Sequence, residues 1–251
     1  MHVSIITSFN KRLSEDSLAL TYVSVNTHYP EVPFYVYHEN SFDKSQGNGI
    51  IDFKPIPNCH IYDIFDENTW LESFLKTSKF STCHTLGVFG TFDPPYYWQR
   101  NAIYWFRKVV ALHSALEYCT TDYMMWLDCD VFFPPEKCIK FDDTVFDWCE
   151  QHDVVSIKRN DRLTETGFIV FNMKRGGREL ITNMLEWYRS HKVFEFDRWD
   201  DCQCMDYVTS QMPHIKFGGA TPQFGAPFSI YDYLQHNKKG HIVRDNGQRG
   251  I

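Results

Sequence analysis

Residues 121–135 read TDYMMWLDCDVFFPP, and this stretch decides the fold. Its centre, Tyr123–Leu127, carries no charge and shows no alternation of apolar and polar residues. A strand that is covered on both faces within a mostly parallel sheet has this pattern. The carboxylates of Asp128 and Asp130 follow the strand directly. Because ligands of open α/β sheets bind beyond the carboxyl ends of the strands, we expect a functional site at this point.

The spacing of Asp128 and Asp130 suits a divalent cation. Residues two apart in an extended chain point to the same side, so both carboxylates can face one ion. Two neighbouring anions repel each other unless something cationic lies between them, and charges set among apolar residues are costly to bury unpaired. A solvated acidic turn is the alternative for any short Asp-x-Asp pattern. The apolar residues on both sides of the pair favour a metal site.

The bulk composition excludes several classes of protein. A chain of 251 residues fits one large α/β domain with a sizeable core. Its 25 Lys and Arg residues against 32 Asp and Glu residues give a net charge of -7, which argues against a protein that coats nucleic acid. No apolar run approaches the roughly 20 residues that span a bilayer, and residues 1–6 do not resemble a secretory signal. We therefore expect a cytoplasmic protein with eight reduced cysteines.

Apolar periodicity and capping residues predict the other elements. The chain opens as strand, helix and strand, a βαβ unit for which a right-handed crossover is expected. Residues 39–95 are irregular apart from one short helix, and no role is assigned to them. The predicted strands are Val3–Thr7, Phe34–Tyr37, Asp153–Ile157 and Thr166–Asn172, and the predicted helices are one capped by Ser14 with Tyr22 and Val25 on its apolar face, Trp70–Leu75, Gln99–Tyr118, Gly177–Ser190 and one capped by Asp200.

Asp128-Cys129-Asp130, placed after an apolar strand, resembles the Asp-x-Asp motif of the GT-A-fold glycosyltransferases. These enzymes hold Mn²⁺ or Mg²⁺ at the motif, against the diphosphate of a sugar nucleotide. The resemblance implies the α/β GT-A fold, a Rossmann-like nucleotide-diphospho-sugar transferase fold with a mixed, mostly parallel central sheet flanked by helices. It also implies a single domain over residues 1–251, with residues 1–130 mainly binding the nucleotide and residues 131–251 mainly serving the acceptor and closing with a metal and diphosphate segment.

The resemblance implies three groups of residues on the donor side. The turn after the first strand would meet the nucleotide, unless it is an ordinary loop. A basic residue on the helix before the motif would brace the first Asp or the nucleotide, unless that helix face is merely solvated. Residues 233–241 resemble a carboxyl-terminal His-x-Lys-Gly motif, with a third metal ligand and a Lys that meets the diphosphate. The residues matched are Thr7, Ser8 and Phe9 for the turn, Lys108 with Arg100 and Arg107 in reserve for the helix, and His236 (with His241 as a rival), Lys238 and Lys239 for the tail.

Two further stretches resemble the sugar side of the family. Residues 166–172, TGFIVFN, match a strand that meets the donor sugar or the acceptor, and residues 199–206 match an acidic stretch beside the anomeric carbon. If the reaction inverts, one carboxylate must take the proton of the acceptor hydroxyl. Core packing and helix capping are the alternatives for these stretches. The residues matched are Thr166, Gly167, Phe168, Trp199 and Asp200 for sugar or acceptor binding, and Asp201 and Asp206 for catalysis, with Asp201 as the base.

Together these matches imply a metal-dependent glycosyltransferase. It would move a sugar from a nucleotide-diphosphate donor, most commonly a UDP-sugar in the family, to a hydroxyl of a glycan, glycolipid or glycoprotein acceptor. One alternative is a nucleotidyltransferase that makes sugar nucleotides, although its Gly-rich phosphate loop is absent from Ser8–Arg12. Another is a catalytically inactive carbohydrate-binding relative. The sugar, the nucleotide, the acceptor, the stereochemical outcome and the oligomeric state are left open.

Overall fold

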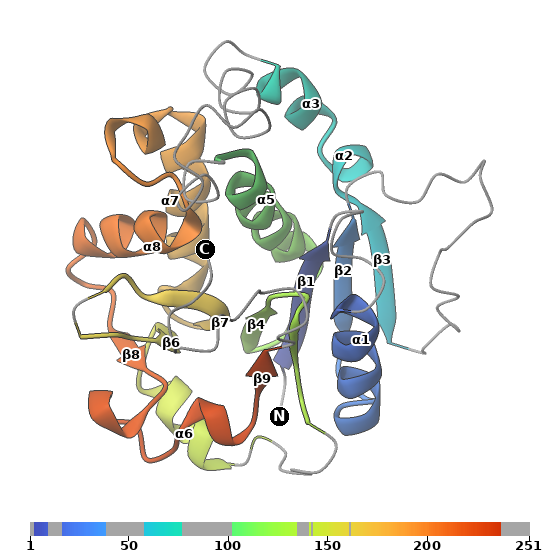
Figure 1. The fold of residues 1–251 in the computed structure, drawn as a ribbon, viewed down its shortest axis with the longest axis vertical. Helices are drawn as coiled ribbons and strands as arrows, with labels where there is room; N and C mark the ends of the chain where they lie inside the picture. The colour runs from blue at the N-terminus through green and yellow to red at the C-terminus, as the bar shows by residue number, and fades with distance from the viewer. Residues whose placement is uncertain are drawn as a thin grey trace, which may run out of the picture.

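A seven-stranded sheet forms the centre of the computed structural model, which describes residues 3–9, 17–38, 58–76, 102–134, 141, 143–160 and 162–236. The strand order is β3-β2-β1-β4-β7-β6-β8 (Figure 1). β4 pairs with β7, and β7 with β6, in antiparallel fashion, while the other four pairings are parallel. The strands are β1 Val3–Phe9, β2 Phe34–His38, β3 Cys59–Asp63, β4 Tyr123–Leu127, β6 Val154–Ile157, β7 Glu165–Asn172 and β8 Phe217–Gly219.

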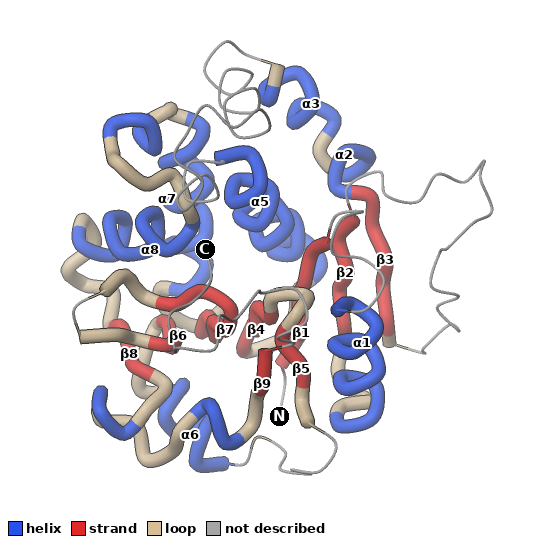
Figure 2. The backbone as a smooth tube through the Cα atoms, in the orientation of Figure 1, coloured by secondary structure: helices blue, strands red, loops and turns tan. Residues whose placement is uncertain are grey.

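Helices cover both faces of this sheet (Figures 1 and 2). α5, α7 and α8 pack together on one face, while α1 and α6 lie on the other. The helices are α1 Ser17–His28, α2 Ile64–Glu67, α3 Thr69–Leu75, α5 Ala102–Tyr118, α6 Asp143–Glu150, α7 Gly177–Arg189 and α8 Asp201–Ser210, with short 3-10 turns at Lys192–Glu195, Pro222–Phe224 and Ile230–Asp232. Within the described ranges, no helix combines the length and the apolar character needed to cross a membrane.

β4 separates two hydrophobic cores. Met124 and Trp126 belong to the core beneath α5, α7 and α8, whereas Tyr123, Met125 and Leu127 belong to the core that includes α1 and α6. Every residue of the strand is buried, which explains its uninterrupted apolar pattern. Because side chains alternate along a strand, the next even-numbered residue, Asp128, falls on the α5 side.

A second, two-stranded sheet lies next to the end of β4. β5 Val131–Phe132 pairs in antiparallel fashion with β9 Gln235–His236, and Val131 lies opposite His236. The pairing brings the carboxyl-terminal part of the described chain beside the residue that follows Asp130. Neither β5 nor β9 has the length or the alternation that makes a strand recognisable in a sequence.

The predicted fold class, an α/β fold with a mixed and mostly parallel sheet flanked by helices, is confirmed. The five predicted strands, the opening βαβ unit and the helices over residues 70–75 and 177–190 are present within a few residues of their expected bounds. The helix predicted from Gln99 is described from Ala102, and its first residues, like the Ser14 cap, lie outside the described ranges. The six described cysteines are free, as expected.

Candidate functional site

The candidate site lies at the point where the chain stops adding strands on one side of β1 and starts adding them on the other side. From β1 the chain adds β2 and β3 on one side, then returns to place β4 on the other side of β1. β1 and β4 run parallel, with Ile6 opposite Trp126, so their carboxyl ends lie at the same edge. Ligands of open α/β sheets bind at such a switch point. Asp128 and Asp130 follow β4 there, as the sequence predicts, because β4 is central and parallel to its neighbour β1.

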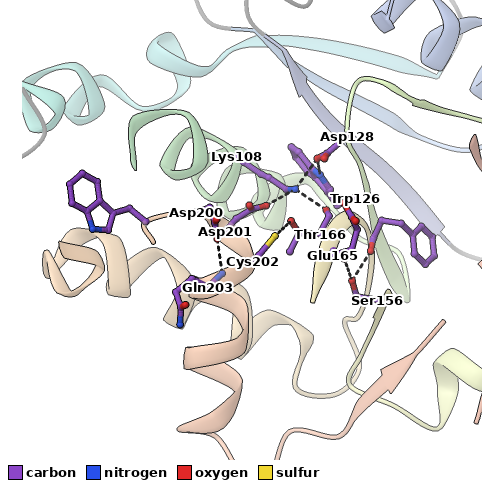
Figure 3. A network of polar contacts seen from close by, with 12 residues as sticks. Lys108, Trp126, Asp128, Ser156, Glu165, Thr166, Asp200, Asp201, Cys202 and Gln203 are labelled. Atoms are coloured by element: carbon purple, nitrogen blue, oxygen red, sulfur yellow. Dashed lines mark hydrogen bonds and ion pairs between the residues drawn. The ribbon is translucent and has the colours of Figure 1, made fainter. Parts of the chain in front are cut away.

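Lys108 connects three elements at this edge (Figure 3). Its Nζ lies 2.8 Å from Asp128 Oδ1, 2.6 Å from Asp201 Oδ2 and 2.8 Å from the carbonyl oxygen of Thr166. An ammonium group has three N–H donors, so each has an oxygen within reach. The side chain comes from α5, which packs on the face toward which Asp128 points. Lys108 therefore joins β4, β7 and α8, and in this arrangement it braces Asp128 rather than a nucleotide.

Lys108 is almost wholly buried, yet it stays charged. Burial by itself lowers the pKa of its ammonium group, but the carboxylates of Asp128 and Asp201 more than compensate and raise that pKa above its usual value. Its Nζ also lies 4.9 Å from the centre of the Trp126 ring, a cation–π distance. A buried cation held in this way keeps its position, because each partner would be left as an uncompensated charge if it moved.

Asp128 is oriented by two donors that meet the same oxygen. Trp126 Nε1 donates to Asp128 Oδ1 at 2.7 Å, and Lys108 Nζ donates to that atom as well. The side chain is 29% exposed, and both of these bonds end on Oδ1, which leaves Oδ2 available. Its backbone N–H donates to the Gly167 carbonyl at 2.9 Å. Asp128 is thus fixed by its neighbours in side chain and backbone.

The charges at this edge fit a divalent cation. Burial raises the pKa of Asp128, Lys108 opposes this, and the nearby carboxylates of Asp130 and Asp201 raise it further. If all are ionised, the carboxylates of residues 128, 130 and 201 outnumber the single ammonium of Lys108 by two charges. Carboxylate oxygens are the ligands that Mg²⁺ and Mn²⁺ prefer, and a divalent ion would balance this excess. The residues present therefore fit the cation that the sequence predicts.

The remaining predicted ligands can be placed only in part. The β5–β9 pairing brings the backbone of His236 next to Val131, one residue after Asp130. The side chain of His236 lies outside what the structure describes, as do Arg100, Lys238, Lys239 and His241. Arg107, the other reserve on α5, lies over the Phe65 ring at 5.3 Å. The ladder brings the backbone of residue 236 next to the segment that carries Asp130, although the two are more than a hundred positions apart in sequence.

Asp200 caps helix α8, as predicted. Its Oδ1 accepts from the backbone N–H of Gln203 at 2.9 Å, and its Oδ2 accepts from Arg198. Burial and the charge of Asp201 raise the pKa of Asp200 to about 6, against the opposing effect of Arg198. Both oxygens are engaged and the residue is fully buried, so Asp200 shapes the start of α8 and does not face a sugar here.

The two predicted catalytic acids have different surroundings. Asp201 is fully buried with Oδ2 against Lys108, and its Oδ1 makes no hydrogen bond to any described residue. Asp206 lies further along α8, where its Oδ2 accepts from the backbone N–H of Thr164 at 2.9 Å. The structure therefore brings Asp201 to the Asp128 cluster, while Asp206 holds the segment that leads into β7.

Most residues matched to sugar binding are covered by the fold. Thr166 and Phe168 are 3% and 1% exposed, and Phe168 packs against Phe141 in the core. Gly167 is buried, and its carbonyl oxygen accepts from the backbone N–H of Asp128. Trp199 is partly exposed, with its Nε1 donating to the Phe196 carbonyl. Of the five residues, Trp199 alone presents surface in the described structure. Thr166 and Gly167 support the site through their backbone carbonyls, Phe168 packs in the core and Asp200 caps α8 with its side chain.

The three residues predicted for the turn after the first strand, Thr7, Ser8 and Phe9, lie within β1, which extends to Phe9. Thr7 and Phe9 are buried, and Phe9 belongs to the core beneath α1, so neither side chain faces an open nucleotide site. Ser8 is partly exposed. Because side chains alternate along β1, Thr7 and Phe9 point to one side and Ser8 to the other, so one of these three side chains is accessible.

A different set of potential metal ligands lies at the start of α8. Asp200, Asp201 and Cys202 present ligand atoms within 4.8 Å of one another, the one such group of three within the described ranges. The carboxylate of Asp200 already accepts from Arg198 and caps α8, and the carboxylate of Asp201 pairs with Lys108. Burial and the neighbouring carboxylates raise the pKa of the Cys202 thiol, which opposes the thiolate that a metal requires. This group is therefore a poor metal site.

Sequence patterns did not identify several contacts of the site. Trp126 reads as a core residue, yet its indole N–H orients Asp128. Arg198 reads as a surface charge, yet it neutralises buried Asp200. The Thr166 carbonyl binds Lys108, a contact that no side-chain pattern encodes. A polar atom on an otherwise apolar strand was the available signal for Trp126, because a buried indole N–H needs a partner.

No protein-family model matches the sequence, and no curated protein matches it. Among solved structures, mouse xyloside xylosyltransferase 1 in its apo form aligns with a TM-score of 0.53 and 11% identity, over 97% of this chain and 100% of that one. A glycosyltransferase involved in glycosylation of the major capsid of PBCV-1 has a TM-score of 0.48 and 14% identity, over 88% and 83% of the two chains. The galactosyltransferase LgtC has a TM-score of 0.46 and 11% identity, over 93% and 86%.

The alignment with the xylosyltransferase covers almost the whole of both chains, and at its low identity it informs on the fold alone. That fold agrees with the sheet order and the helical layers described above. The chain has the α/β fold of GT-A glycosyltransferases.

Proposed function

We propose that this protein is a metal-dependent glycosyltransferase that uses a nucleotide-diphosphate sugar as donor. The observation that carries the proposal is the position of Asp128 and Asp130. They follow the central strand of a GT-A-type fold, at the switch point between β1 and β4, and a buried lysine orients the first of them. We further propose that residues 1–251 form one domain, with the nucleotide bound mainly by residues 1–130.

Asp128, Asp130 and His236 are the proposed ligands of Mn²⁺ or Mg²⁺. The imidazole favours Mn²⁺, because nitrogen ligands suit transition metals better than Mg²⁺. When bound, the ion would act as a Lewis acid that neutralises charge on the departing diphosphate. The support for this ligand set is the excess of carboxylates at the edge of the sheet and the pairing of residue 236 with residue 131.

The chain's own side chains prepare this site before any ligand binds. Lys108 and Trp126 hold one oxygen of Asp128, which leaves its second oxygen directed away from them. A ligand whose direction is fixed in advance loses less conformational entropy on binding. Lys238 and Lys239 are the proposed contacts of the diphosphate, and Ser8 is the proposed contact of the nucleotide. Arg100 is the reserve candidate for a basic contact to the nucleotide. Lys108 is proposed to hold Asp128 in position and not to contact the nucleotide.

Asp201 is the proposed residue on the acceptor side. It lies beside Asp128, and its Oδ1 is the carboxylate oxygen not engaged by Lys108. If the reaction inverts, this oxygen would take the acceptor proton once substrate displaces the groups that cover it. Trp199, which is partly exposed near α8, is the proposed contact of a sugar ring. Asp206 is proposed only as a support of the segment before β7.

The donor is proposed to be a UDP-sugar, and the acceptor a hydroxyl of a glycan, glycolipid or glycoprotein. The test is a screen of purified protein with Mn²⁺ and a panel of sugar nucleotides, which measures release of nucleoside diphosphate. We expect release with at least one donor, and its loss on addition of a chelator. A nucleotidyltransferase would release no nucleoside diphosphate from these donors, but would release pyrophosphate when given a nucleoside triphosphate and a sugar 1-phosphate. A carbohydrate-binding relative would release nothing in either assay.

Asp130→Asn on the best donor tests the metal assignment. Removing a ligand carboxylate should lower activity by roughly 100-fold or more, because even the residues that only orient metal ligands contribute about 10- to 100-fold. Asp147→Asn, an exposed acid on α6, is the matched control and should retain wild-type activity. Undiminished turnover by Asp130→Asn would refute the proposed cation site.

A further inference from the structure

Two hydroxyl groups of α1 contact the turn that carries Asp130. Thr21 Oγ1 lies 2.7 Å from the carbonyl oxygen of Cys129 and 2.7 Å from that of Val131. Ser24 Oγ accepts a hydrogen bond from the backbone N–H of Phe133 at 3.1 Å. The helix thus contacts every second residue of the segment that leaves β4.

The spacing on the helix makes this possible. Residues three apart lie on the same face of a helix, so the hydroxyls of Thr21 and Ser24 point toward the same segment. Ser24 Oγ also donates to the Thr21 carbonyl at 2.9 Å, which orients the second hydroxyl. The two carbonyl oxygens that meet Thr21 flank Asp130 on either side. Fixing both of them restricts the backbone dihedrals on which the direction of the Asp130 side chain depends.

The contacts are shielded from water. Thr21 is fully buried, Ser24 is 4% exposed, and Cys129 and Val131 are 5% and 2% exposed. A hydroxyl has a single proton, so the carbonyls of residues 129 and 131 share one donor. A threonine in the middle of a helix has a lower propensity than alanine or leucine, and a buried hydroxyl must find partners. An apolar residue would pack there more simply if helix docking were the only need.

The opposite side of the turn is also held. Val131 pairs with His236 across the β5–β9 ladder, and its N–H donates to the Asp128 carbonyl at 2.8 Å. The segment from Asp128 to Val131 is therefore a closed turn between α1 and β9. Of its two carboxylates, Asp128 is oriented by Lys108 and Trp126. The contacts of α1 are made to the backbone on both sides of the other, Asp130.

We propose that Thr21 is a positioning residue of the cation site, which fixes the direction of Asp130 by binding the carbonyl oxygens on both sides of it. The inference rests on the proposed function, because it assumes that Asp130 binds the cation. Thr21 itself touches neither cation nor substrate. Ser24 extends the same contact to Phe133 and has the smaller effect, because its bond lies beyond the two residues adjacent to Asp130.

The test compares three variants of the full-length protein with the wild type. Thr21→Val keeps the shape and removes the hydroxyl, Thr21→Ser keeps the hydroxyl, and Thr27→Val is a matched control. Thr27 lies on the same helix, but its hydroxyl bonds to the Val23 carbonyl of that helix and is exposed. The readouts are Mn²⁺ affinity, from the electron paramagnetic resonance signal of free Mn²⁺, and amide hydrogen exchange over residues 129–134.

We expect Thr21→Val to weaken Mn²⁺ binding by roughly 10- to 100-fold, the range for residues that orient metal ligands. Hydrogen exchange over residues 129–134 should become faster in the same variant without added metal. Thr21→Ser and Thr27→Val should bind Mn²⁺ as the wild type does. Recovery by serine separates an effect of the hydroxyl from a change of packing.

The outcomes also separate this inference from the proposed function. Wild-type Mn²⁺ affinity in Thr21→Val, while Asp130→Asn loses binding, overturns the role of Thr21 and leaves the cation site standing. Absence of Mn²⁺ binding by the wild type overturns both. Should circular dichroism show that Thr21→Val does not fold, Ser24→Ala is the variant that tests the proposal. A measurable loss of Mn²⁺ affinity in Ser24→Ala supports a positioning role for the α1 hydroxyls, and an unchanged affinity overturns it.

Discussion

The ammonium of Lys108 on α5 lies 2.6 Å from the carboxylate of Asp201, the first residue of α8. Both side chains are almost completely excluded from solvent, at 5% and 1% exposure. The pair therefore joins two helices through charges that water cannot reach and solvate. Removing either member has consequences for stability as well as for the site.

Lys108→Met should destabilise the protein by about 3–5 kcal/mol, because it leaves a buried carboxylate without its cation. The measurement is the free energy of unfolding in urea. Lys174→Met is the control, because the Lys174–Asp122 ion pair has a similar length, 2.8 Å, but is exposed. Exposed pairs contribute little, so the control should unfold close to the wild type. Equal losses in the two variants would contradict the special role of the buried pair.

Asp201→Asn should separate the two roles of Asp201. If the residue acts as a base, kcat should fall by roughly 10²- to 10⁴-fold with Mn²⁺ affinity unchanged. If it serves only to hold Lys108, Mn²⁺ affinity should fall together with kcat, because Asp128 loses its orientation. Steady-state kinetics combined with Mn²⁺ titration distinguishes these results, and full activity with wild-type affinity would exclude both roles.

Trp126→Phe should weaken cation binding while keeping the core packed. The phenyl ring fills most of the same space but lacks the N–H that donates to Asp128 Oδ1 at 2.7 Å. We expect Mn²⁺ affinity to fall by about tenfold, as for other residues that orient ligands. Trp148→Phe removes an indole bond of 3.1 Å to the Gly219 carbonyl, on the other face of the sheet, and should leave Mn²⁺ affinity unchanged.

Asp153 gives a prediction for pH. Burial raises the pKa of its carboxyl, but hydrogen bonds from the backbone N–H groups of Gly176 (2.8 Å) and Lys216 (2.7 Å), together with Arg175, more than compensate, so the pKa is lowered. A lowered folded-state pKa means that the unfolded chain binds the proton more tightly. The stabilisation is therefore complete above the unfolded pKa of about 3.9 and is lost as the pH falls through the folded value.

Asp153→Asn should accordingly be less stable than the wild type at neutral pH, by about 1–3 kcal/mol for the weakened bonds. The difference should begin to shrink as the pH falls below about 4, where the carboxyl of the unfolded wild-type chain takes up a proton, and should continue to shrink toward the lowered pKa of the folded state. Urea unfolding of both proteins between pH 3 and pH 7 measures this. A difference that is constant over the whole range would show that the charge of Asp153 does not contribute.

The central strand β4 and the start of α8 can be predicted from the sequence, because each is marked by residues that are adjacent in the chain. β4 is buried on both faces and is uniformly apolar, and the Asp200 cap precedes α8 directly. The edge strand β3 was missed, because Cys59–Asp63 is mostly unburied and carries no continuous apolar run. The antiparallel direction of β7 was also missed, since direction depends on the connection between strands and not on the residues within them.

The contacts within the site depend on tertiary packing and were accessible only in part. The sequence resemblance predicts that Lys108 contacts either the first Asp or the nucleotide, and the structure places it against Asp128. Its second partner, Asp201, was assigned to the acceptor side alone, because no local pattern shows that α8 packs against α5. The hydroxyls of Thr21 and Ser24 were invisible for the same reason: their partners lie more than a hundred residues away.

The ladder between Val131 and His236 has a consequence for biosynthesis. During translation the ribosome releases the sheet-forming residues of β1 to β7 well before residue 236 leaves its exit tunnel. Until then the nascent chain lacks the strand that flanks the aspartate turn. Competence to bind the ion should consequently arise only once residue 236 has emerged and paired with Val131.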